Sequence, residues 1–361
     1  MRDVGVSNAL DSSSRFATRQ HLFATLVTNP TIADLGEHAL IARITRRSAS
    51  PRWAVIGPGD DAAVVQGPRG ALDVLTTDAL VEGVHFDCAF VPPRAIGQRA
   101  LAANVSDLAA MGATPRGLLL SLALPPSLAL AVLDGIVDGF LDAANAEGAA
   151  LLGGNITRTA GPCIINVTAS GSVHRRGVLA RTGARAGDGV YVTGYLGAAA
   201  IGLASLRAGV DAAGDDPLRA CQERYLFPVA RTRAGRQLSQ YGAAACAIDL
   251  SDGLADGLHQ LAAASGVGMM IEADALPLPP GVIAWHAAHG GAAVGTALSG
   301  GDDYELLFTV RPRHGGRLRG AMRRLGDLPI TRIGVVTADR AVLVRDGKSI
   351  SPIGAGFEHF R

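Results

Sequence analysis

The chain has 361 residues and a formal net charge of +1 at pH 7, which is long enough for two domains with cores of their own. Because positive and negative charges nearly cancel, bulk charge gives no reason to expect a nucleic acid or an anionic membrane as a partner. The four cysteines are far apart and form no CxxC pair, which argues against a zinc site or a disulfide framework and favours a cytoplasmic location.

The first part of the chain predicts an extension followed by a mixed domain. Residues 1–35 are polar and lack an apolar core followed by a cleavage-type site, which predicts a flexible extension rather than a signal peptide. The apolar run 118–133 is too short and too broken by Pro125 and Pro126 to span a membrane. Within a first domain, 36–175, the patterns predict helices at 37–44, 93–111 and 127–147, and strands at 62–65, 72–76, 149–152 and 164–173.

The Arg- and Gly-rich stretch 174–187 marks a boundary before a second domain, 176–361. The sequence of the second domain predicts a hairpin that turns at Asp346-Gly347. Its other predicted strands are 189–193, 245–250, 269–272, 304–310 and 330–336, and its predicted helices are 196–206, 229–241, 253–264 and 316–325. Because helices and strands are mixed without strict alternation, the predicted class is α+β.

Lysine is almost absent from this chain. The only lysine is Lys348, so no GxxxxGK[ST] phosphate-binding loop exists. Any bound phosphate must therefore be held by arginine, backbone amides or a metal ion. Arg158 and Arg181 are candidates for this contact, and Arg181 is the better placed of the two because it lies in a glycine-rich turn before a strand. The sequence has no HExxH, GxSxG or protein-kinase HRD and DFG motifs.

Several aspartates lie inside apolar, glycine-rich segments, where a hydrated surface acid is not expected. They are Asp60, Asp61, Asp78, Asp107, Asp249, Asp252, Asp302 and Asp303. Buried neighbouring carboxylates repel each other and lose hydration, and a divalent cation such as Mg²⁺ with oxygen ligands offsets that cost. A single acid of this kind could instead cap a helix or a turn, as Asp252 could, but five such clusters favour a metal site.

Spacing supports convergence of these residues. Asn104 and Asp107 are three residues apart on a predicted helix, so their side chains share a face. Asp249 ends a predicted strand. The segment GPGDDA also matches a loose dinucleotide-binding pattern, but its two aspartates would repel a bare pyrophosphate at a helix N-terminus. His85 could contact a substrate or could be an ordinary structural histidine.

Seven segments, in this order, are similar to motifs of thiamine-monophosphate kinases. They are GPGDDAAVV, TTDALVEGVHF, NVSDLAAMGATP, LLGGNITRT, ARTGARAGD, IDLSDGLADGL and SGGDDYELLFT. Together they cover residues 36–310, and GFEHF near the end is a weaker match. The wider superfamily, which includes aminoimidazole ribonucleotide synthetase and selenophosphate synthetase, shares only a thinner version of this set.

The resemblance implies a two-domain, aminoimidazole ribonucleotide synthetase-like α+β fold. It also implies a homodimer whose N-terminal sheets pair into a barrel, with ATP and several Mg²⁺ ions in the groove. The implied reaction transfers a phosphoryl group from ATP to thiamine phosphate and yields thiamine diphosphate and ADP.

The same resemblance implies roles for individual residues. The implied metal ligands are Asp61, Thr76, Thr77, Asp78, Asp107, Asn155, Asp249 and Asp252. The implied nucleotide contacts are Gly154, Asn155, Arg181 and Ser251, and the implied thiamine phosphate contacts are His85, Asp302 and Phe357. Of these, the expected catalytic residues are Asp78, Asp107, Asp249 and Arg181.

Two departures from the family pattern matter. Asn155 stands where the family usually has a metal-binding aspartate, and Asp302 stands where many members have glutamate.

Three alternatives stay open from the sequence: another ATP-using enzyme of the superfamily, a non-catalytic nucleotide-binding scaffold and a metal-dependent phosphohydrolase. Selenophosphate synthetase is disfavoured, because the chain lacks both a cysteine before Cys88 and an early lysine.

Overall fold

The computed structural model describes residues 30–59 and 61–356. Residues 1–29 of the predicted extension, together with Asp60 and Phe357, lie outside the described residues. The described part begins with α1 (Ile32–Leu35), which is followed by α2 (Glu37–Thr45). The Ile32 side chain is buried, and its amide donates a hydrogen bond to the carbonyl of Leu128 at 3.0 Å, so α1 is fixed to the N-terminal domain.

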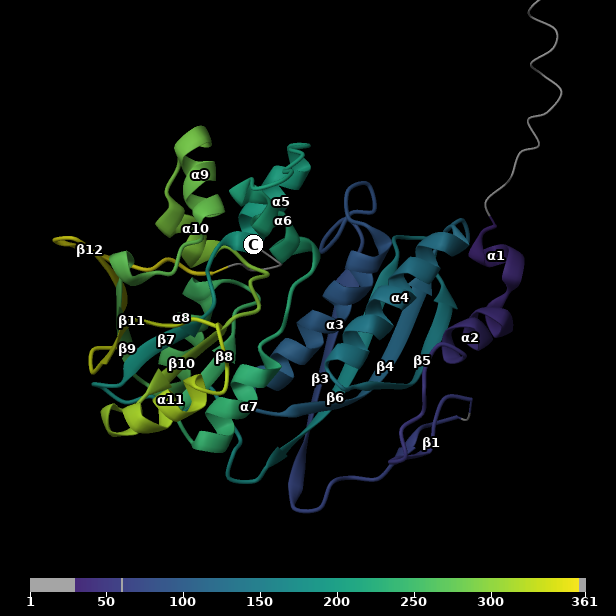
Figure 1. The fold of residues 1–361 in the computed structure, drawn as a ribbon, viewed down its shortest axis with the longest axis horizontal. Coiled ribbons are helices and arrows are strands. Elements are labelled where there is room, and N and C mark those ends of the chain that lie inside the picture. Colours follow the sequence, from purple (N-terminus) through teal and green to yellow (C-terminus); the bar gives the residue numbers. More distant parts are fainter. Residues whose placement is uncertain (1–29, 60, 357–361) are drawn as a thin grey trace, which may run out of the picture.

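The N-terminal domain is a four-stranded sheet with helices on one face (Figure 1). In spatial order its strands are β3 (Ala71–Val81), β6 (Ile164–His174), β4 (Thr114–Leu124) and β5 (Ala150–Arg158). The pairs are antiparallel except β4 with β5. Helices α3 (Pro93–Ala110) and α4 (Leu130–Ala146) pack against each other and on this sheet. A short hairpin of β1 (Ala54–Ile56) and β2 (Val64–Val65) lies outside it.

The central strand β4 is absent from the sequence-based prediction, and β5 is longer than predicted. Side chains on β4 alternate, with Leu118, Leu120, Leu122 and Leu124 buried beneath the helices. Because the other face of β4 is also largely apolar, its sequence is a continuous apolar run that does not distinguish a strand from a helix.

The C-terminal domain contains a seven-stranded sheet. Its strands, in spatial order, are β13 (Ser349–Pro352), β12 (Val342–Asp346), β9 (Gly268–Glu272), β11 (Ile330–Thr337), β7 (Gly189–Thr193), β10 (Leu306–Val310) and β8 (Cys246–Asp249). All of the predicted strands and the predicted hairpin of this domain are present, which confirms the α+β class. Between His174 and Gly189 the chain passes from one sheet to the other.

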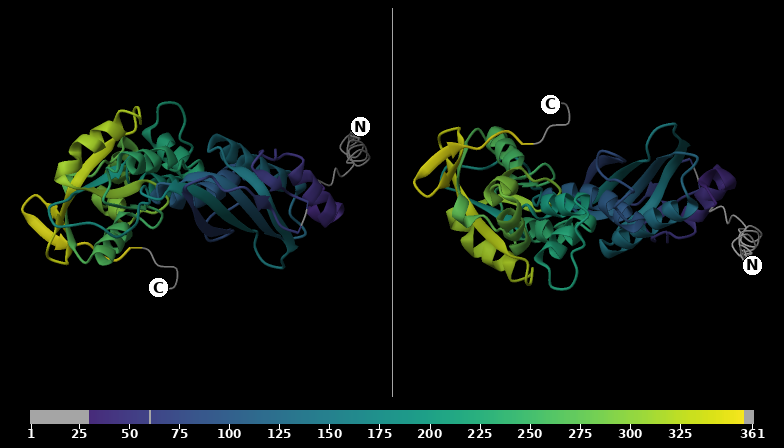
Figure 2. Two further views of the ribbon diagram at one scale, coloured as in Figure 1. Left: turned by 90° about the horizontal axis from the view of Figure 1, so that it is seen from below. Right: turned by 90° about the horizontal axis from the view of Figure 1, so that it is seen from above.

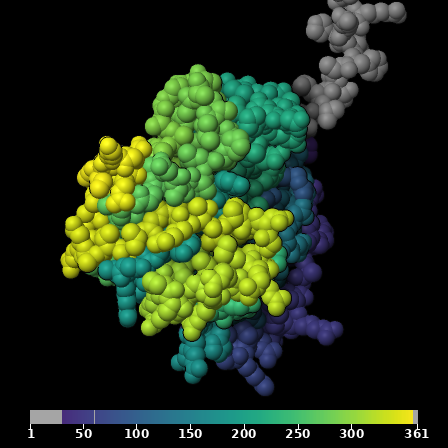
Figure 3. All heavy atoms as spheres, turned by 60° about the vertical axis from the view of Figure 1, so that its left-hand side comes forward, coloured from purple at the N-terminus to yellow at the C-terminus, as the bar shows by residue number. Residues whose placement is uncertain are grey.

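Seven α-helices of the described residues belong to this second domain. They are α5 (Ala198–Arg207), α6 (Pro217–Leu226), α7 (Thr232–Tyr241), α8 (Leu254–Ser265), α9 (Pro280–His289), α10 (Ala293–Ser299) and α11 (Gly315–Met322), with short 3-10 turns η1 (Ala273–Ala275) and η2 (Pro312–His314). Figure 3 shows the atoms of this domain, in green and yellow, packed together on one side of the molecule. The sequence analysis did not predict α6, α9 and α10. Within the described ranges, no helix is both long enough and apolar enough to cross a membrane.

Helix α3 joins the two domains (Figure 2). It packs on its own sheet and also contacts α7 and β8 of the C-terminal domain. At the contact with α7, a Cβ atom on Gly235 would lie 1.9 Å from the carbonyl oxygen of Ala109, so only glycine permits this close approach. The C-terminal part of α3 therefore lies at the boundary between the domains.

Candidate active site

Buried and half-buried carboxylates from both domains meet at the C-terminal half of α3. Asp107 of α3 accepts a hydrogen bond from the hydroxyl of Thr76 on β3. Asp249, the last residue of β8, accepts a hydrogen bond from Ser106 Oγ at 2.8 Å. The neighbouring positions Ser106 and Asp107 thus contact different domains, which places the acids of β3, α3 and β8 together.

Asp78 also faces this cluster. Its amide donates a hydrogen bond to Asn104 Oδ1 at 3.1 Å, which confirms that Asn104 and Asp107 face the same side of α3. Burial raises the pKa of Asp78 to about 6, with added repulsion from Asp107 and Asp252. Burial likewise raises the pKa of Asp249 to about 7, followed by repulsion from Asp107. These four aspartates are therefore close enough for the negative charge of one carboxylate to disfavour ionisation of its neighbours.

The structure does not place Asp252 at the N-cap position of α8. Helix α8 has Gly253 as its N-cap residue, with φ of 96°, and no side-chain cap hydrogen bond. The Asp252 side chain instead lines a pocket, described below, and is coupled electrostatically to Asp78.

The donor types of this cluster suit Mg²⁺, because carboxylate and hydroxyl oxygens are the ligands that this ion uses. A bound divalent cation would also offset the repulsion that raises the pKa of Asp78 and Asp249. Among the described residues, however, no group of three or more His, Cys, Asp or Glu side chains is arranged so that it could hold a metal ion. The site therefore has the chemistry for magnesium but no complete cage.

Two further residues with implied metal roles lie on strands of the N-terminal sheet. The Thr77 hydroxyl donates to the carbonyl of Val167 at 3.1 Å and lies 3.1 Å from the hydroxyl of Thr168. Because side chains alternate along a strand, Thr77 points to the uncovered face of the sheet, opposite to Thr76. Asn155 on β5 is exposed and lies in register with Ser121.

Gly154 has a packing reason to be glycine. A Cβ atom at this position would lie 1.8 Å from the carbonyl oxygen of Leu120 on β4. A side chain here would separate the two strands, so the glycine is required by the sheet whether or not it contacts a nucleotide.

Asp61 and Arg181 are both exposed. Asp61 lies in the loop between β1 and β2. Arg181 precedes β7, donates to Oε1 of Gln260, and lies near enough to Asp107 to lower the pKa of that carboxyl group, against the larger effect of burial. Its guanidinium is the positive charge beside the cluster that the sequence analysis expected for a phosphate contact.

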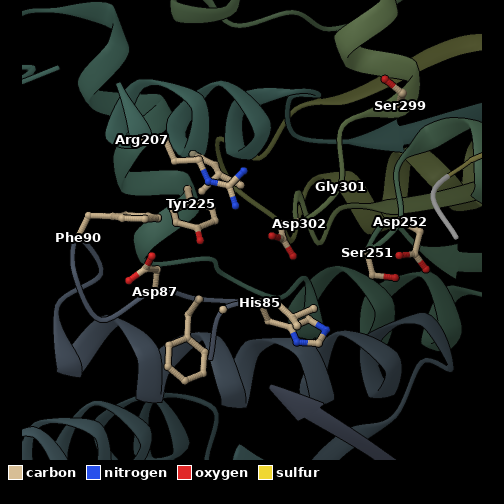
Figure 4. A pocket seen from close by; sticks show the side chains of 14 residues that line it. His85, Asp87, Phe90, Arg207, Tyr225, Ser251, Asp252, Ser299, Gly301 and Asp302 are labelled. Carbon is tan, nitrogen blue, oxygen red and sulfur yellow. The ribbon is translucent and has the colours of Figure 1, made fainter. Parts of the chain in front are cut away.

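A cavity of about 230 Å³ opens beside the carboxylates (Figure 4). It brings together four residues that the sequence analysis selected: His85, Ser251, Asp252 and Asp302. It also contains residues that the analysis missed, namely Asp87, Phe90, Leu203, Arg207 and Tyr225. Figure 4 shows Ser251 and Asp252 at one end and Phe90, Arg207 and Tyr225 at the other. The pocket therefore has an acidic end next to the cluster and an end with two aromatic rings and an arginine.

The orientation of His85 is fixed by the turn that follows β3. Its Nδ1 accepts a hydrogen bond from the amide of Val81 at 3.0 Å, so Nδ1 carries no proton in this arrangement. The imidazole lies in the cavity wall.

Asp302 also lines the cavity, and its carboxylate has two protein partners. It accepts a hydrogen bond from Arg99 at 3.0 Å and one from the hydroxyl of Tyr304 at 3.1 Å. Its backbone lies in the left-handed region, with φ of 65°.

The adjacent acid, Asp303, does not belong to the carboxylate cluster, so its grouping with Asp302 as a metal-type pair is wrong. Its carboxylate accepts hydrogen bonds from the amides of Gly197 and Ala199 at 2.6 and 3.2 Å. These amides belong to the start of α5 and offset its burial. The reason for an acid at this position is therefore helix capping.

The comparisons with known proteins agree with this architecture. Residues 59–173 match the AIR synthase related protein, N-terminal domain, and residues 185–346 match the AIR synthase related protein, C-terminal domain. The thiamine-monophosphate kinase of Salmonella typhimurium is 38% identical over 328 residues, which are 90% of this chain and 98% of that protein.

Two solved structures are also similar. The crystal structure of thiamine-monophosphate kinase from Stenotrophomonas maltophilia is 38% identical with a TM-score of 0.76, over 86% of this chain and 96% of that one. A structure of AaThiL complexed with AMPPCP and TMP is 32% identical with a TM-score of 0.71, over 92% of this chain and 100% of that one. This chain therefore belongs to the thiamine-monophosphate kinase family of enzymes, within the AIR synthase related proteins.

Proposed function

We propose that this enzyme phosphorylates thiamine phosphate with ATP and yields thiamine diphosphate. The observation that carries the proposal is the convergence of Asp78, Asp107, Asp249 and Asp252. The last of these lines one end of a pocket that His85 and Asp302 also line. The complex of a relative with AMPPCP, an ATP analogue, and TMP supports the choice of substrates.

The charge of the acceptor determines which catalytic groups the protein must supply. A phosphate monoester is largely ionised at neutral pH, since its second pKa is about 6, so its attack on the γ-phosphate of ATP needs no general base. The remaining barrier comes from bringing two polyanions into line. Magnesium would supply the positive charge that offsets their repulsion, and Arg181 would add a guanidinium beside Asp107.

The proposed site divides the work among the chain's own residues. Asp78, Asp107, Asp249 and Asp252 would hold magnesium between the domains, and Thr76 would orient Asp107. The further proposed ligands are Asp61, Thr77 and Asn155. Gly154, Asn155, Arg181 and Ser251 would contact the nucleotide, whereas His85, Asp302 and Phe357 would contact thiamine phosphate. The last residue lies outside the described residues.

The acceptor pocket has features that suit thiamine phosphate. Its acidic end would receive the phosphate together with magnesium. The rings of Phe90 and Tyr225 offer aromatic faces to the heterocycles at the other end. Asp87 lies at the aromatic end, beside Phe90 and Tyr225, and offers negative charge to the thiazolium cation, whereas Asp302 lies between the two ends.

An assay with ATP, Mg²⁺ and thiamine phosphate tests the proposal directly. We expect thiamine diphosphate and ADP to appear in equal amounts, and no ADP to form when thiamine phosphate is omitted. Free phosphate without thiamine diphosphate would favour a phosphohydrolase. Binding of ATP without any turnover would favour a nucleotide-binding scaffold.

We also propose that the enzyme is a homodimer in which the uncovered faces of two N-terminal sheets meet in a barrel. On this face Leu75 is 72% exposed and Leu119 is 42% exposed, and such apolar positions favour contact with another surface. Light scattering at micromolar concentration is expected to give twice the chain mass. A monomer mass would rule out the barrel.

A further inference from the structure

Arg99 is a buried charge that the proposed chemistry does not use. It lies on α3, and only 1% of its surface is exposed. A buried guanidinium needs partners, because water no longer solvates its charge. It donates hydrogen bonds to the carbonyl of Tyr225, to the carbonyl of His85 at 3.3 Å and to Asp302 Oδ2 at 3.0 Å. Its guanidinium carbon also lies 4.1 Å from the centre of the Tyr225 ring.

These three partners belong to three different walls of the acceptor pocket (Figure 4). His85 follows β3 of the N-terminal domain, Tyr225 lies on α6, and Asp302 lies in the segment before β10. Arg99 itself comes from the helix that joins the domains. One side chain thus connects the walls of the pocket across the domain boundary.

The backbone around Asp302 depends on such support. Both Asp302 and Tyr304 lie in the left-handed region, with φ of 65° and 48°, which non-glycine residues adopt only when their surroundings hold them there. Their amides donate to the carbonyls of Ser251 and Leu250 at 2.7 and 2.9 Å. The ion pair with Arg99 adds a contact from the other domain to this segment.

We propose that Arg99 is a positioning residue for the acceptor, which acts by holding Asp302 and the main chain of His85 in place and by compensating the charge of Asp302. The identity of the acceptor rests on the proposed function. Without the arginine, Asp302 would present an unpaired carboxylate to an anionic phosphate monoester, and the two domains would lose a direct connection at the pocket.

Steady-state kinetics of Arg99→Met test this role. We expect the KM for thiamine phosphate to rise about tenfold, while the KM for ATP stays within about twofold. Arg99 acts on the acceptor through Asp302 in this proposal. The double variant Arg99→Met/Asp302→Asn is therefore expected to raise the KM for thiamine phosphate by less than the product of the two single effects. A KM for thiamine phosphate that stays at the wild-type value in Arg99→Met, or strict additivity in the double variant, would overturn the proposal.

Arg231→Met is the matched control. Arg231 is also a largely buried arginine, and it pairs with Glu305 at 2.6 Å; neither residue lines the pocket. We expect this variant to lower Tm and to leave the KM for thiamine phosphate unchanged. An equal rise of KM in both variants would mean that Arg99 acts only through general stability.

Hydrogen exchange on the substrate-free protein tests the role of Arg99 independently of which acceptor the enzyme uses. We expect the amides of Asp302 and Tyr304 to exchange faster in Arg99→Met but not in Arg231→Met. If the wild-type protein does not phosphorylate thiamine phosphate, the proposed function fails, and the exchange rates still decide whether Arg99 holds this segment.

Arg99→Lys covers the case in which Arg99→Met does not fold. Lysine keeps the charge but lacks the planar fork that reaches several acceptors together. We expect a KM increase of about threefold for thiamine phosphate and intermediate exchange rates at Asp302 and Tyr304. Wild-type values of both quantities would overturn the role of the guanidinium.

Discussion

Glu305 and the aspartate cluster at α3 differ in what compensates their charge. Glu305 accepts hydrogen bonds from Arg224 at 2.8 Å, from Arg231 at 2.6 Å and from the hydroxyl of Thr193 at 2.6 Å. Within the described ranges, the hydroxyls of Thr76 and Ser106 donate hydrogen bonds to Asp107 and Asp249 of the aspartate cluster, and the exposed Arg181 lies near Asp107. Protein groups therefore compensate Glu305, whereas we propose that a bound cation compensates the aspartate cluster.

This difference distinguishes acids that stabilise the fold from acids that serve activity, although both kinds lie in similar apolar segments of the sequence. Where protein groups compensate an acid, its removal should cost stability. Where they do not, the acids already oppose folding, and their removal should cost activity instead. The following predictions test that contrast, beginning with the largest expected effect.

The largest effect should follow the replacement of a cluster acid. We expect Asp107→Asn to lower kcat about 10³-fold or more, because it removes a charge that would hold the proposed cation and, through it, the phosphates in place. Its Tm should be equal to or above that of the wild type, since repulsion within the cluster is relieved. Kinetics and thermal unfolding check both parts, and Asp346→Asn on an exposed turn is the control. Near-normal turnover together with tightly held Mg²⁺ would contradict the assignment.

The opposite pattern is expected for the compensated group. Glu305→Gln should lower the free energy of unfolding by about 3 kcal/mol, because two arginines lose their buried partner. Urea unfolding measures this change. The variant should keep its KM for thiamine phosphate if it is assayed well below its Tm. A variant that is as stable as the wild type but inactive would break the comparison.

The pH dependence of stability should also distinguish the two kinds of acid. The pKa values of Asp78 and Asp249, about 6 and about 7, lie above the ordinary value for aspartate. Ionisation is therefore easier in the unfolded chain, and the metal-free protein should lose stability as pH rises from about 4 to about 7. Saturating Mg²⁺ should flatten this loss.

Asp303 provides the internal control for that measurement. Burial raises its pKa to about 7 as well, but its carboxylate contacts backbone amides outside the cluster. Asp303→Asn should reduce the loss of stability with rising pH by the same amount with and without Mg²⁺. Asp249→Asn should reduce this loss in the metal-free protein but have little effect on it when Mg²⁺ is saturating. Thermal unfolding at several pH values, with and without the ion, separates the two contributions, and equal sensitivity of both effects to Mg²⁺ would refute the contrast.

The smallest effect is expected at the protein surface. Arg345 and Glu272 form an exposed ion pair at 2.7 Å between β12 and β9. Arg345→Ala should change the free energy of unfolding by less than about 1 kcal/mol, because water already solvates both charges. It should leave the kinetics unchanged. A larger loss would show that exposure is a poor guide to the cost of losing a charge partner in this fold.

Most of the C-terminal sheet could be predicted from the sequence, because strands such as β7 are short apolar runs bounded by glycine and turn residues. Strand β4 could not, since it is buried by helices on one side and is apolar on the other. Helix α6 was missed for a different reason: its sequence is polar and has little apolar periodicity. These errors arise where tertiary packing, rather than local pattern, decides the conformation.

The carboxylate cluster was also largely predictable, because acids inside apolar segments are unusual and imply a compensating partner. A signal for Arg99 existed too, since it is a lone charge in the alanine-rich segment AIGQRALAANV. Its partners could not be identified, because Asp302 is 203 residues further along the chain. Nothing in the sequence indicated that Tyr225 lines the pocket.

The sequence by itself determined the chemistry available to this protein: many acids in apolar surroundings, a single lysine and no phosphate-binding loop, which together direct phosphate binding toward metal ions and arginine. Only the tertiary structure decided which acids are paired within the protein and which gather in the cluster where we propose a cation. The physical reason is that charge compensation depends on distances of a few ångströms between residues that are far apart in the chain, and only the packing of the two domains on α3 sets those distances.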